Sequence, residues 1–283
     1  MNFKKVHPDF GIEIKEIKIN KINHKEITEI LNLFEEYSLI VLKNQKITNE
    51  EQLEFAKNFG ELEITKPGTI GSNSNLVILT NMNEDGKVVD HSHKQAKNDR
   101  ANQQWHSDSS FKIHPAHASI LNGRITPKIG GNTQFICMRN IYNNLDQSIQ
   151  KQLDNLDAIH HFAHSRSKID SSMVSQIELD KFPPVVHPMV KINPVNNKKA
   201  VYFGSHTKSI KNLDGDESSK LHKYLNDFIN NEDYIYSHKW DDFDLIIWDN
   251  RSVVHRGQPY DITKPRYLVR ATVSDTMSTG TYL

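Results

Sequence analysis

A histidine and an aspartate stand two positions apart in the segment WHSDSSF, at His106 and Asp108. If this segment is a strand, side chains alternate between its two faces, so His106 and Asp108 point to the same side. One imidazole and one carboxylate on one face make two of the three ligands of a metal site. Taken alone, such a pair is more simply explained as a strand-edge histidine that is hydrogen-bonded to a nearby acid.

A third metal ligand is available farther along the chain, at His255 in IIWDNRSVVHRGQPYD. This histidine follows an apolar strand and stands beside Gly257 and Pro259. Two histidines and one carboxylate form the facial triad that holds non-haem Fe(II) and leaves coordination positions open for other molecules. We therefore predict a metal site composed of His106, Asp108 and His255.

Two arginines, Arg266 and Arg270, follow in the segment RYLVRATV. Residues four apart on a strand share a face, so both guanidinium groups are expected on one side, with Leu268 between them. Buried arginines are costly unless each meets an anion, and guanidinium groups bind carboxylates through paired hydrogen bonds. The pattern indicates two carboxylate-bearing small molecules near the metal. An edge strand with both arginines in solvent or in salt bridges is the alternative.

The elements that must position these residues are mostly strands. Apolar periodicity predicts helices over residues 26–37, 49–59, 146–153 and 216–230, the second opened by a capping box between Thr48 and Glu51. Strands are predicted at 10–19, 39–42, 75–81, 185–192, 199–203, 233–238, 245–248 and 267–273. Many short strands with Gly, Pro and Asn between them indicate a jelly roll or barrel with helices outside. The chain shows no repeat or clear linker, so we expect one domain over residues 1–283.

Composition excludes several classes of protein. The 283 residues carry 35 Lys+Arg and 35 Asp+Glu, and this balance argues against a nucleic-acid binder, which needs clustered cations in excess. No apolar run approaches the roughly 18 residues of a membrane span, and the N-terminal segment lacks the apolar region of a secretory signal. The single cysteine, Cys137, permits neither an intrachain disulfide nor a cysteine metal cluster. We expect a cytoplasmic protein without nucleic-acid or membrane partners.

The motifs WHSDSSF, GGNTQF at residues 130–135, WDNRSVVHRGQPYD and RYLVRAT together resemble the TauD/TfdA family of Fe(II)- and 2-oxoglutarate-dependent dioxygenases. Within that family the chain is more similar to the 2,4-dichlorophenoxyacetate (aryloxyalkanoate) dioxygenase branch than to the taurine branch. That similarity is carried by HPAHASILNGRITPKIGGNTQF, FAHSRS and VHPMVKINPVNNKKAVYFGSH. The resemblance implies a mostly β fold with flanking helices, an α+β arrangement with a double-stranded β-helix (jelly-roll) core. It also implies a homo-oligomer, a dimer or a tetramer.

The resemblance assigns roles to individual positions. The three predicted metal ligands match the iron ligands of the family. Arg266 matches the arginine that binds the distal carboxylate of 2-oxoglutarate, and Thr133 matches the threonine that helps to hold this cosubstrate. Arg270 matches the position that binds the anionic head of the primary substrate.

Five other positions are interpreted one by one. Asn102 falls near a cofactor- or substrate-proximal asparagine of the taurine enzymes, but the surrounding loop differs and no role is assigned to it. Lys66 is interpreted as a solvated lysine, with a second anion contact as the alternative. His206, in YFGSH, lies in a segment that resembles part of the substrate pocket of the family. Trp105 and Trp248 are expected to pack in the core.

The implied activity is hydroxylation of a small anionic, carboxylate-bearing substrate. Fe(II), 2-oxoglutarate and O2 take part, and succinate and CO2 are released. If the hydroxylated carbon bears an ether oxygen, the product collapses and the ether is cleaved. Within the family, a sulfonate held at Arg270 is the alternative. From other classes, a metal-dependent hydrolase or a non-catalytic jelly-roll binding protein is also open. The sequence has no His-Glu-x-x-His helix for the former, and it retains all three ligands, which the latter would not require.

Overall fold

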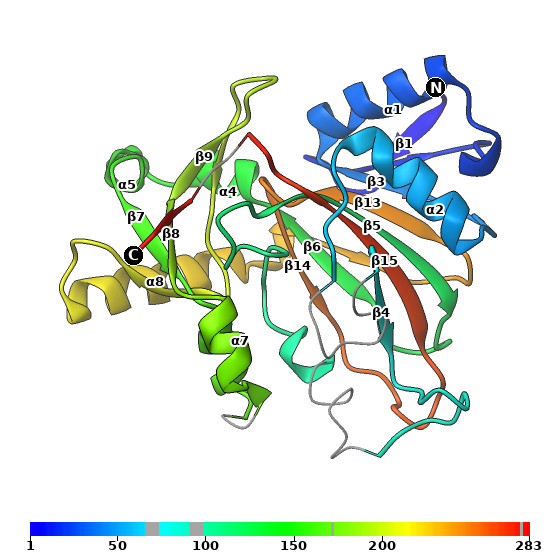
Figure 1. Cartoon of the computed structure of the whole chain (residues 1–283). Helices are drawn as coiled ribbons and strands as arrows, with labels where there is room; N and C mark the ends of the chain where they lie inside the picture. Colours follow the sequence, from blue (N-terminus) through cyan, green and yellow to red (C-terminus); the bar gives the residue numbers. More distant parts are fainter. Residues whose placement is uncertain (66–73, 91–98, 171–172, 278–279) are drawn as a thin grey trace.

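The computed structural model describes residues 1–65, 74–90, 99–170, 173–277 and 280–283. Within these residues the largest sheet has seven strands, in the spatial order β1-β2-β3-β13-β5-β15-β4 (Figure 1). The strands are β1 (Phe3–Lys5), β2 (Ile12–Ile14), β3 (Leu39–Leu42), β4 (Leu76–Thr80), β5 (Ala116–Ile125), β13 (Leu245–Asp249) and β15 (Tyr267–Ser274). Neighbouring strands are antiparallel except β2 and β3, which are parallel.

A smaller sheet faces one side of this large sheet. Its strands are β12 (Ile235–His238), β6 (Thr133–Cys137) and β14 (Val253–Gly257), in that order. Phe135 and Val253 of the small sheet pack in one buried cluster with residues of the large sheet that include Leu121, Ile246 and Leu268. Because side chains alternate along a strand, every second residue of β5, β13, β14 and β15 therefore points into the space between the two sheets.

Two helices cover the opposite side of the large sheet, α1 (His24–Tyr37) and α2 (Asn49–Ala56), drawn in blue and cyan in Figure 1. Each begins with a capping box, Asn23 with Glu26 and Thr48 with Glu51. The 3-10 turns η1 (Ile19–Lys21) and η2 (Lys57–Phe59) adjoin them in the chain. The helices bury their apolar faces in a second cluster, in which Ile30 and Phe34 of α1 and Phe55 of α2 pack against outward side chains of the sheet. These sheet residues include Ile40, Ile120 and Ile247.

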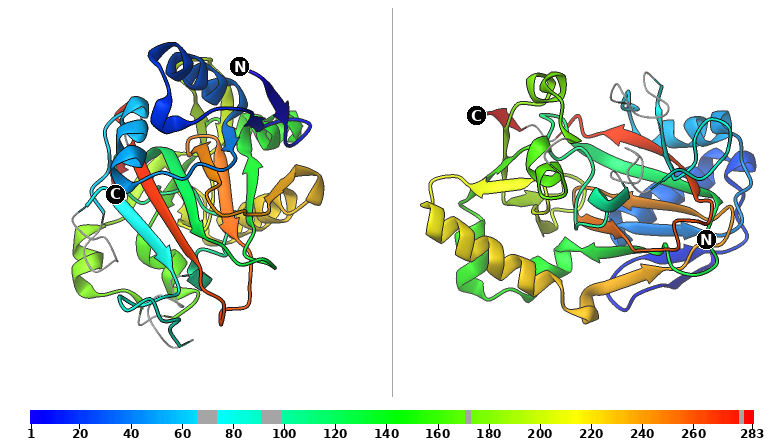
Figure 2. Two further views of the ribbon diagram at one scale, coloured as in Figure 1. Left: turned by 90° about the vertical axis from the view of Figure 1, so that its right-hand side faces the viewer. Right: turned by 90° about the horizontal axis from the view of Figure 1, so that it is seen from below.

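A third layer lies behind the small sheet. It contains α4 (Met138–Asn144), α5 (Gln147–Leu153), α8 (Gly215–Ile229) and the paired strands β9 (Val190–Ile192) and β10 (Lys199–Val201). These elements share a buried cluster with Ile136 of β6 and Val254 of β14, the residues that point away from the large sheet. Figure 2 shows that α8, in yellow, lies at the opposite end of the molecule from α1 and α2.

The remaining described elements join this third layer. A four-stranded sheet has the order β11-β7-β8-β16 and contains β7 (Asp157–His160), β8 (Val185–Pro188), β11 (Thr207–Ile210) and β16 (Thr281–Tyr282). Beside it in the chain are α6 (Phe162–Ser167), α7 (Gln176–Lys181) and η4 (Glu232–Tyr234). In the part of the chain that the structure describes, none of the helices combines the length and apolar character needed to cross a bilayer.

Most predicted elements are present, but the extended conformation considered for the segment with His106 and Asp108 is not. The strand predicted at 39–42 is β3, and the predicted helices correspond to α1, α2 with η2, α5 and α8. The strand predicted at 185–192 is divided into β8 and β9. Residues 105–108 do not form a strand, because His106 makes only an isolated bridge and Asp108 stands in a turn. The next residue, Ser109, has a positive φ of 53°, which ends any extended conformation there.

Candidate metal centre

His106 and His255 come from distant parts of the chain and are joined through their backbones. His106 N donates to His255 O at 3.0 Å, and His255 N donates to His106 O at 2.9 Å. His255 stands on β14 two positions after Val253, so it points into the space between the sheets. There its ring packs 4.5 Å from that of Trp248 and 4.2 Å from that of His106, measured between centroids. The isolated bridge thus places His106 beside His255 without a strand.

Asp108 completes a compact group with these two histidines. Its Oδ1 is 4.0 Å from Nε2 of His106, and its Oδ2 is 3.8 Å from Nε2 of His255. The potential ligand atoms of the three residues lie within 4.8 Å of one another, and all three residues are buried. Two imidazoles and one carboxylate are a donor set that suits non-haem Fe(II). We call His106, Asp108 and His255 the candidate metal centre.

A chain of buried hydrogen bonds orients Asp108. Ser119 Oγ donates to Asp108 Oδ2 at 2.7 Å. Asn250 accepts from the backbone N of Asp108 and from Trp248 Nε1, both at 3.0 Å, and its Nδ2 donates to Ser119 Oγ at 2.9 Å. Sequence reasoning missed Ser119 and Asn250. Their signal was a single polar residue within or beside an apolar strand, where burial demands a partner.

The two histidines are in the protonation state that a metal requires. His106 Nδ1 donates to Gln104 O at 2.7 Å, which leaves Nε2 as the available lone pair. Burial is the main cause that lowers the pKa of His106, and burial followed by the neighbouring His106 holds the pKa of His255 well below its ordinary value. Both imidazoles are therefore neutral near pH 7, the form that binds metal ions.

Arg270 contacts the candidate metal centre directly. It stands on β15 two positions after Leu268, on the face toward the small sheet, and its Nη1 donates to Asp108 Oδ1 at 2.5 Å. Burial alone would raise the pKa of the Asp108 carboxyl. The charge of Arg270 is the largest influence in the opposite direction, and with the electrostatic effect of the two histidines and the hydrogen bond from Ser119 it holds that pKa well below its usual range. Asp108 is therefore ionised throughout the neutral range.

Thr133 lies where β6 meets the end of β14. It pairs with Gly257, two positions after His255, and its Oγ1 accepts a hydrogen bond from Trp240 Nε1 at 3.0 Å. The turn before it, at Gly130, approaches the segment after β14 so closely that a Cβ at Gly130 would lie 2.6 Å from Pro259 O. Gly130 also has a φ of 72°, a conformation that favours glycine.

Arg266 borders the same segment from the other side. Its guanidinium lies 5.4 Å from the ring centroid of Tyr260, and its Nη1 lies 3.7 Å from Asp99 Oδ1. Its backbone N donates to Asn81 Oδ1 at 2.8 Å. Nε of Arg266 is buried without a hydrogen-bond partner among the described residues. The structure therefore places both residues predicted to bind 2-oxoglutarate, Thr133 and Arg266, along residues 257–260.

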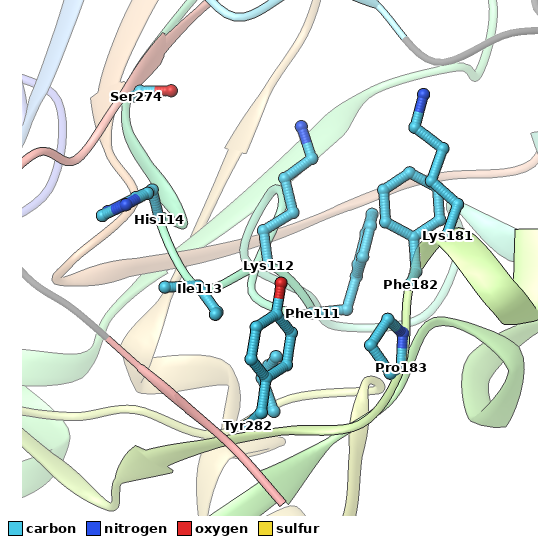
Figure 3. Close-up of a pocket in the computed structure, with 10 residues that line it drawn as sticks. Phe111, Lys112, Ile113, His114, Lys181, Phe182, Pro183, Ser274 and Tyr282 are labelled. Atoms are coloured by element: carbon cyan, nitrogen blue, oxygen red, sulfur yellow. The ribbon is translucent and has the colours of Figure 1, made fainter.

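His206 stands beside His106, at 6.3 Å between ring centroids. Its Nδ1 is 3.2 Å from Ser110 Oγ, and its Nε2 has no partner among the described residues. Phe111 packs against His206 at 5.0 Å and also lines a separate cavity of about 290 Å³ (Figure 3). Lys112, the next residue in the chain, also lines this cavity (Figure 3). Phe111 thus contacts His206 and also lines this cavity.

The other sequence-based interpretations have mixed outcomes. Asn102 contributes its backbone carbonyl, which accepts a hydrogen bond from Gly257 N at 2.9 Å. Lys66 lies outside the described residues. Trp105 and Trp248 are both buried, as expected.

Comparisons with known proteins agree with the geometry. The model of the family described as taurine catabolism dioxygenase TauD, TfdA family matches residues 2–272. The chain is 33% identical over 276 residues to the alpha-ketoglutarate-dependent 2,4-dichlorophenoxyacetate dioxygenase of Cupriavidus pinatubonensis, covering 95% of this chain and 96% of that protein. It is 28% identical over 282 residues to the (S)-phenoxypropionate/alpha-ketoglutarate-dioxygenase of Sphingobium herbicidovorans, covering 97% and 95%.

A solved structure is also similar over the whole length. The crystal structure of AAD-2 in complex with Mn(II) and N-oxalylglycine has a TM-score of 0.91 and 32% identity, covering 98% of this chain and 100% of that chain. The predicted α+β fold with a jelly-roll core is confirmed by this likeness. The predicted enzyme class, an oxidoreductase that uses Fe(II) and 2-oxoglutarate, is confirmed as well. The chain belongs to the TauD/TfdA family of dioxygenases.

Proposed function

We propose that this protein hydroxylates a small aryloxyalkanoate, a carboxylate-bearing aryl ether, in a reaction that consumes 2-oxoglutarate and O2. The observation that carries the proposal is the buried group of His106, Asp108 and His255, whose potential ligand atoms lie within 4.8 Å of one another with Arg270 in contact. The names of the two relatives support this class of substrate. Hydroxylation next to the ether oxygen would lead to ether cleavage.

The candidate metal centre would hold Fe(II). When bound there, Fe(II) supplies the redox chemistry that couples decarboxylation of 2-oxoglutarate to oxidation of a substrate C–H bond. His106 and His255 offer neutral imidazoles, and Asp108 offers an ionised carboxylate that Ser119 orients. The protein is thus ready to bind a divalent cation without having to lose a proton first.

The two arginines divide the recognition of anions. Arg266 and Thr133 would bind the distal carboxylate of 2-oxoglutarate, because both lie along residues 257–260 and the buried Nε of Arg266 has no partner among the described residues. Arg270 would bind the carboxylate of the primary substrate, because it lies next to Asp108. Each guanidinium would thereby form charge-assisted hydrogen bonds to a bound anion.

A sulfonate is the second candidate for the anion at Arg270. A guanidinium binds both anions, so Arg270 does not separate them. The hydrolase and binding-protein alternatives lose their support, because the family match covers residues 2–272. A homo-oligomeric state and a cytoplasmic location remain part of the proposal.

Succinate release tests the proposal directly. The protein would be loaded anaerobically with Fe(II) and 2-oxoglutarate and exposed to O2 with a panel of aryloxyacetates, 2-aryloxypropionates, taurine, other sulfonates and simple carboxylates. We expect aryloxyalkanoates to stimulate succinate release and to yield a phenol. Stimulation by sulfonates alone would replace the proposed substrate class. Failure to bind 2-oxoglutarate would contradict the proposed reaction itself.

A further inference from the structure

Arg166 is a second guanidinium close to the candidate metal centre. It stands on α6, a helix of six residues that sequence periodicity did not reveal. Its Cζ lies 5.3 Å from the ring centroid of Phe162, and its Nη1 is 3.3 Å from Ser165 Oγ. The residue is partly buried, and its Nε is covered from solvent without a hydrogen-bond partner among the described residues.

Helix α6 is held against the backbone of the candidate metal centre. Gln104 Nε2 donates to Ser165 O at 3.0 Å, and Gln104 O accepts the hydrogen bond from His106 Nδ1 at 2.7 Å. At the start of the helix, His161 N donates to His206 O at 2.9 Å. One residue, Gln104, therefore links the helix that carries Arg166 to the orientation of His106.

The electrostatics show that the charge of Arg166 reaches the centre. The pKa of Arg166 is lowered to about 10, mainly by burial, while Asp108 and Glu178 oppose this shift and Arg270 adds to it. The like charges of Arg166 and Arg270 thus disfavour each other, and an anion that contacts both would relieve this repulsion.

An aromatic surface adjoins the guanidinium. Phe162, which lies under Arg166, packs against Phe111 at 4.9 Å, and Phe111 packs against His206 at 5.0 Å. Phe182 closes the same cluster, 5.2 Å from Phe111. A cation beside a row of aromatic rings suits a ligand with an anionic end and an aryl end.

Arg270 offers an incoming carboxylate only part of its guanidinium. Its Nη1 already donates to Asp108 Oδ1, and its Nε is buried without a partner among the described residues. We propose that Arg166 is a second anion-binding residue for the primary substrate, so that Arg166 and Arg270 both bind its carboxylate while Phe111, supported by Phe162, contacts its aryl ring. This inference rests on the proposed function and extends it to the residues that select the substrate.

Calorimetry under conditions without turnover tests the inference. Protein loaded with Mn(II) and N-oxalylglycine would be titrated with phenoxyacetate and with its neutral analogue phenoxyacetamide. Arg166→Gln removes the charge, and Arg166→Lys retains a cation without the guanidinium plane. The matched control is Arg124→Gln, which removes a partly buried guanidinium that is bonded to Gln52 far from the centre along the large sheet.

We expect Arg166→Gln to raise the Kd of phenoxyacetate by about tenfold or more, the effect of losing one charged hydrogen-bonding partner, and to leave the Kd of N-oxalylglycine unchanged. Binding of phenoxyacetamide should change little. Arg166→Lys should fold like the wild type and bind phenoxyacetate with intermediate affinity. Arg124→Gln should bind like the wild type.

Three results would count against these ideas, and they are separable. Unchanged phenoxyacetate affinity in both Arg166 variants overturns the inference. Equal weakening of phenoxyacetamide also overturns it, because the effect would then come from shape and not from charge. A wild-type protein that fails to bind N-oxalylglycine overturns the proposed function, whatever the Arg166 variants do.

Discussion

The guanidinium of Arg270 donates a hydrogen bond of 2.5 Å to the carboxylate of Asp108, one of the three residues of the candidate metal centre. One residue is predicted to bind the anion of the substrate and the other to bind the metal, so the two tasks share a contact. A carboxylate that arrives at Arg270 competes with Asp108 for the same N–H groups. Binding of substrate and the electron-donating strength of a metal ligand are therefore coupled through one side chain.

The division of labour between the two arginines can be measured with alanine variants. We expect Arg270→Ala to raise the KM of the aryloxyalkanoate by about 10- to 100-fold, as loss of a charged hydrogen-bonding group predicts, with a smaller effect on 2-oxoglutarate. Arg266→Ala should do the reverse. Initial rates of succinate release with each substrate varied in turn give both KM values, and Arg124→Ala serves as the control. If the two effects were exchanged, the assignments of Arg266 and Arg270 would be exchanged too.

The three residues of the candidate metal centre should be indispensable. His106→Ala, Asp108→Ala and His255→Ala are each expected to lower bound Fe(II) and 2-oxoglutarate turnover by more than about 100-fold, since even residues that merely support a ligand account for 10- to 100-fold. Metal analysis after dialysis and a succinate assay provide the measurements. The exposed His24 on α1 gives a matched His→Ala control. Normal turnover in any of the three variants would show that the ligand set is wrong.

Gly204 should be sensitive to the addition of one methyl group. A Cβ there would lie 3.1 Å from Trp105 O and 3.3 Å from Cα of His106, so the backbone that carries the metal ligand would have to move. We expect Gly204→Ala to weaken Mn(II) binding by about tenfold, because ligand geometry must be held within about 0.5 Å. Gly215→Ala is the control, since a Cβ at Gly215 meets nothing within 4 Å. Equal metal affinity in the two variants would mean that the loop at Gly204 does not constrain His106.

His187 should make the fold sensitive to acid. Burial lowers its pKa from 6.5 to about 4, so the folded protein binds fewer protons than the unfolded chain between these values. Stability from this residue is complete above pH 6.5 and is lost as the pH falls through 4, on the order of 3 kcal/mol in all.

Replacement by a residue that does not titrate tests this sign. Chemical unfolding at pH 7 and pH 4.5 should show a smaller loss of unfolding free energy for His187→Gln than for the wild type. Glutamine can still donate to Lys112 O, the partner of His187 Nε2 at 2.9 Å. His24→Gln should lose as much stability as the wild type. A His187→Gln variant with the full wild-type loss would remove His187 as the cause.

Elements with a local signal were predictable, and elements that depend on distant partners were not. The strand β3 and the capped helix α2 were predicted because apolar spacing and the Thr48 capping box act within a few residues. The strand β5 was not predicted, and the polar residues Ser119 and Asn122 interrupt the apolar pattern of its sequence. In the structure both are buried and bonded to distant groups, Ser119 to Asp108 and Asn122 to Asp244 O.

The same distinction applies to the site. The residue types and order of His106, Asp108 and His255 indicated the metal triad, but the bridge that joins the two histidines has no local pattern. Arg166 was not singled out, because α6 is too short to show periodicity and its link to His106 passes through Gln104. The metal ligands could therefore be predicted from residue type and order in the sequence, but the contacts that position them could not.

The mutual backbone hydrogen bonds of His106 and His255 join residues more than half the length of the chain apart. Closing so long a loop costs conformational entropy, and only the favourable contacts of the completed sheets offset this cost. We therefore expect the His106–His255 pair to form late in folding. A divalent cation that binds both imidazoles has affinity for the finished protein alone. During refolding, the rate at which the protein begins to bind metal would therefore report the rate at which the His106 and His255 segments come together. Added cation would also lower the rate of unfolding, because unfolding separates these two segments.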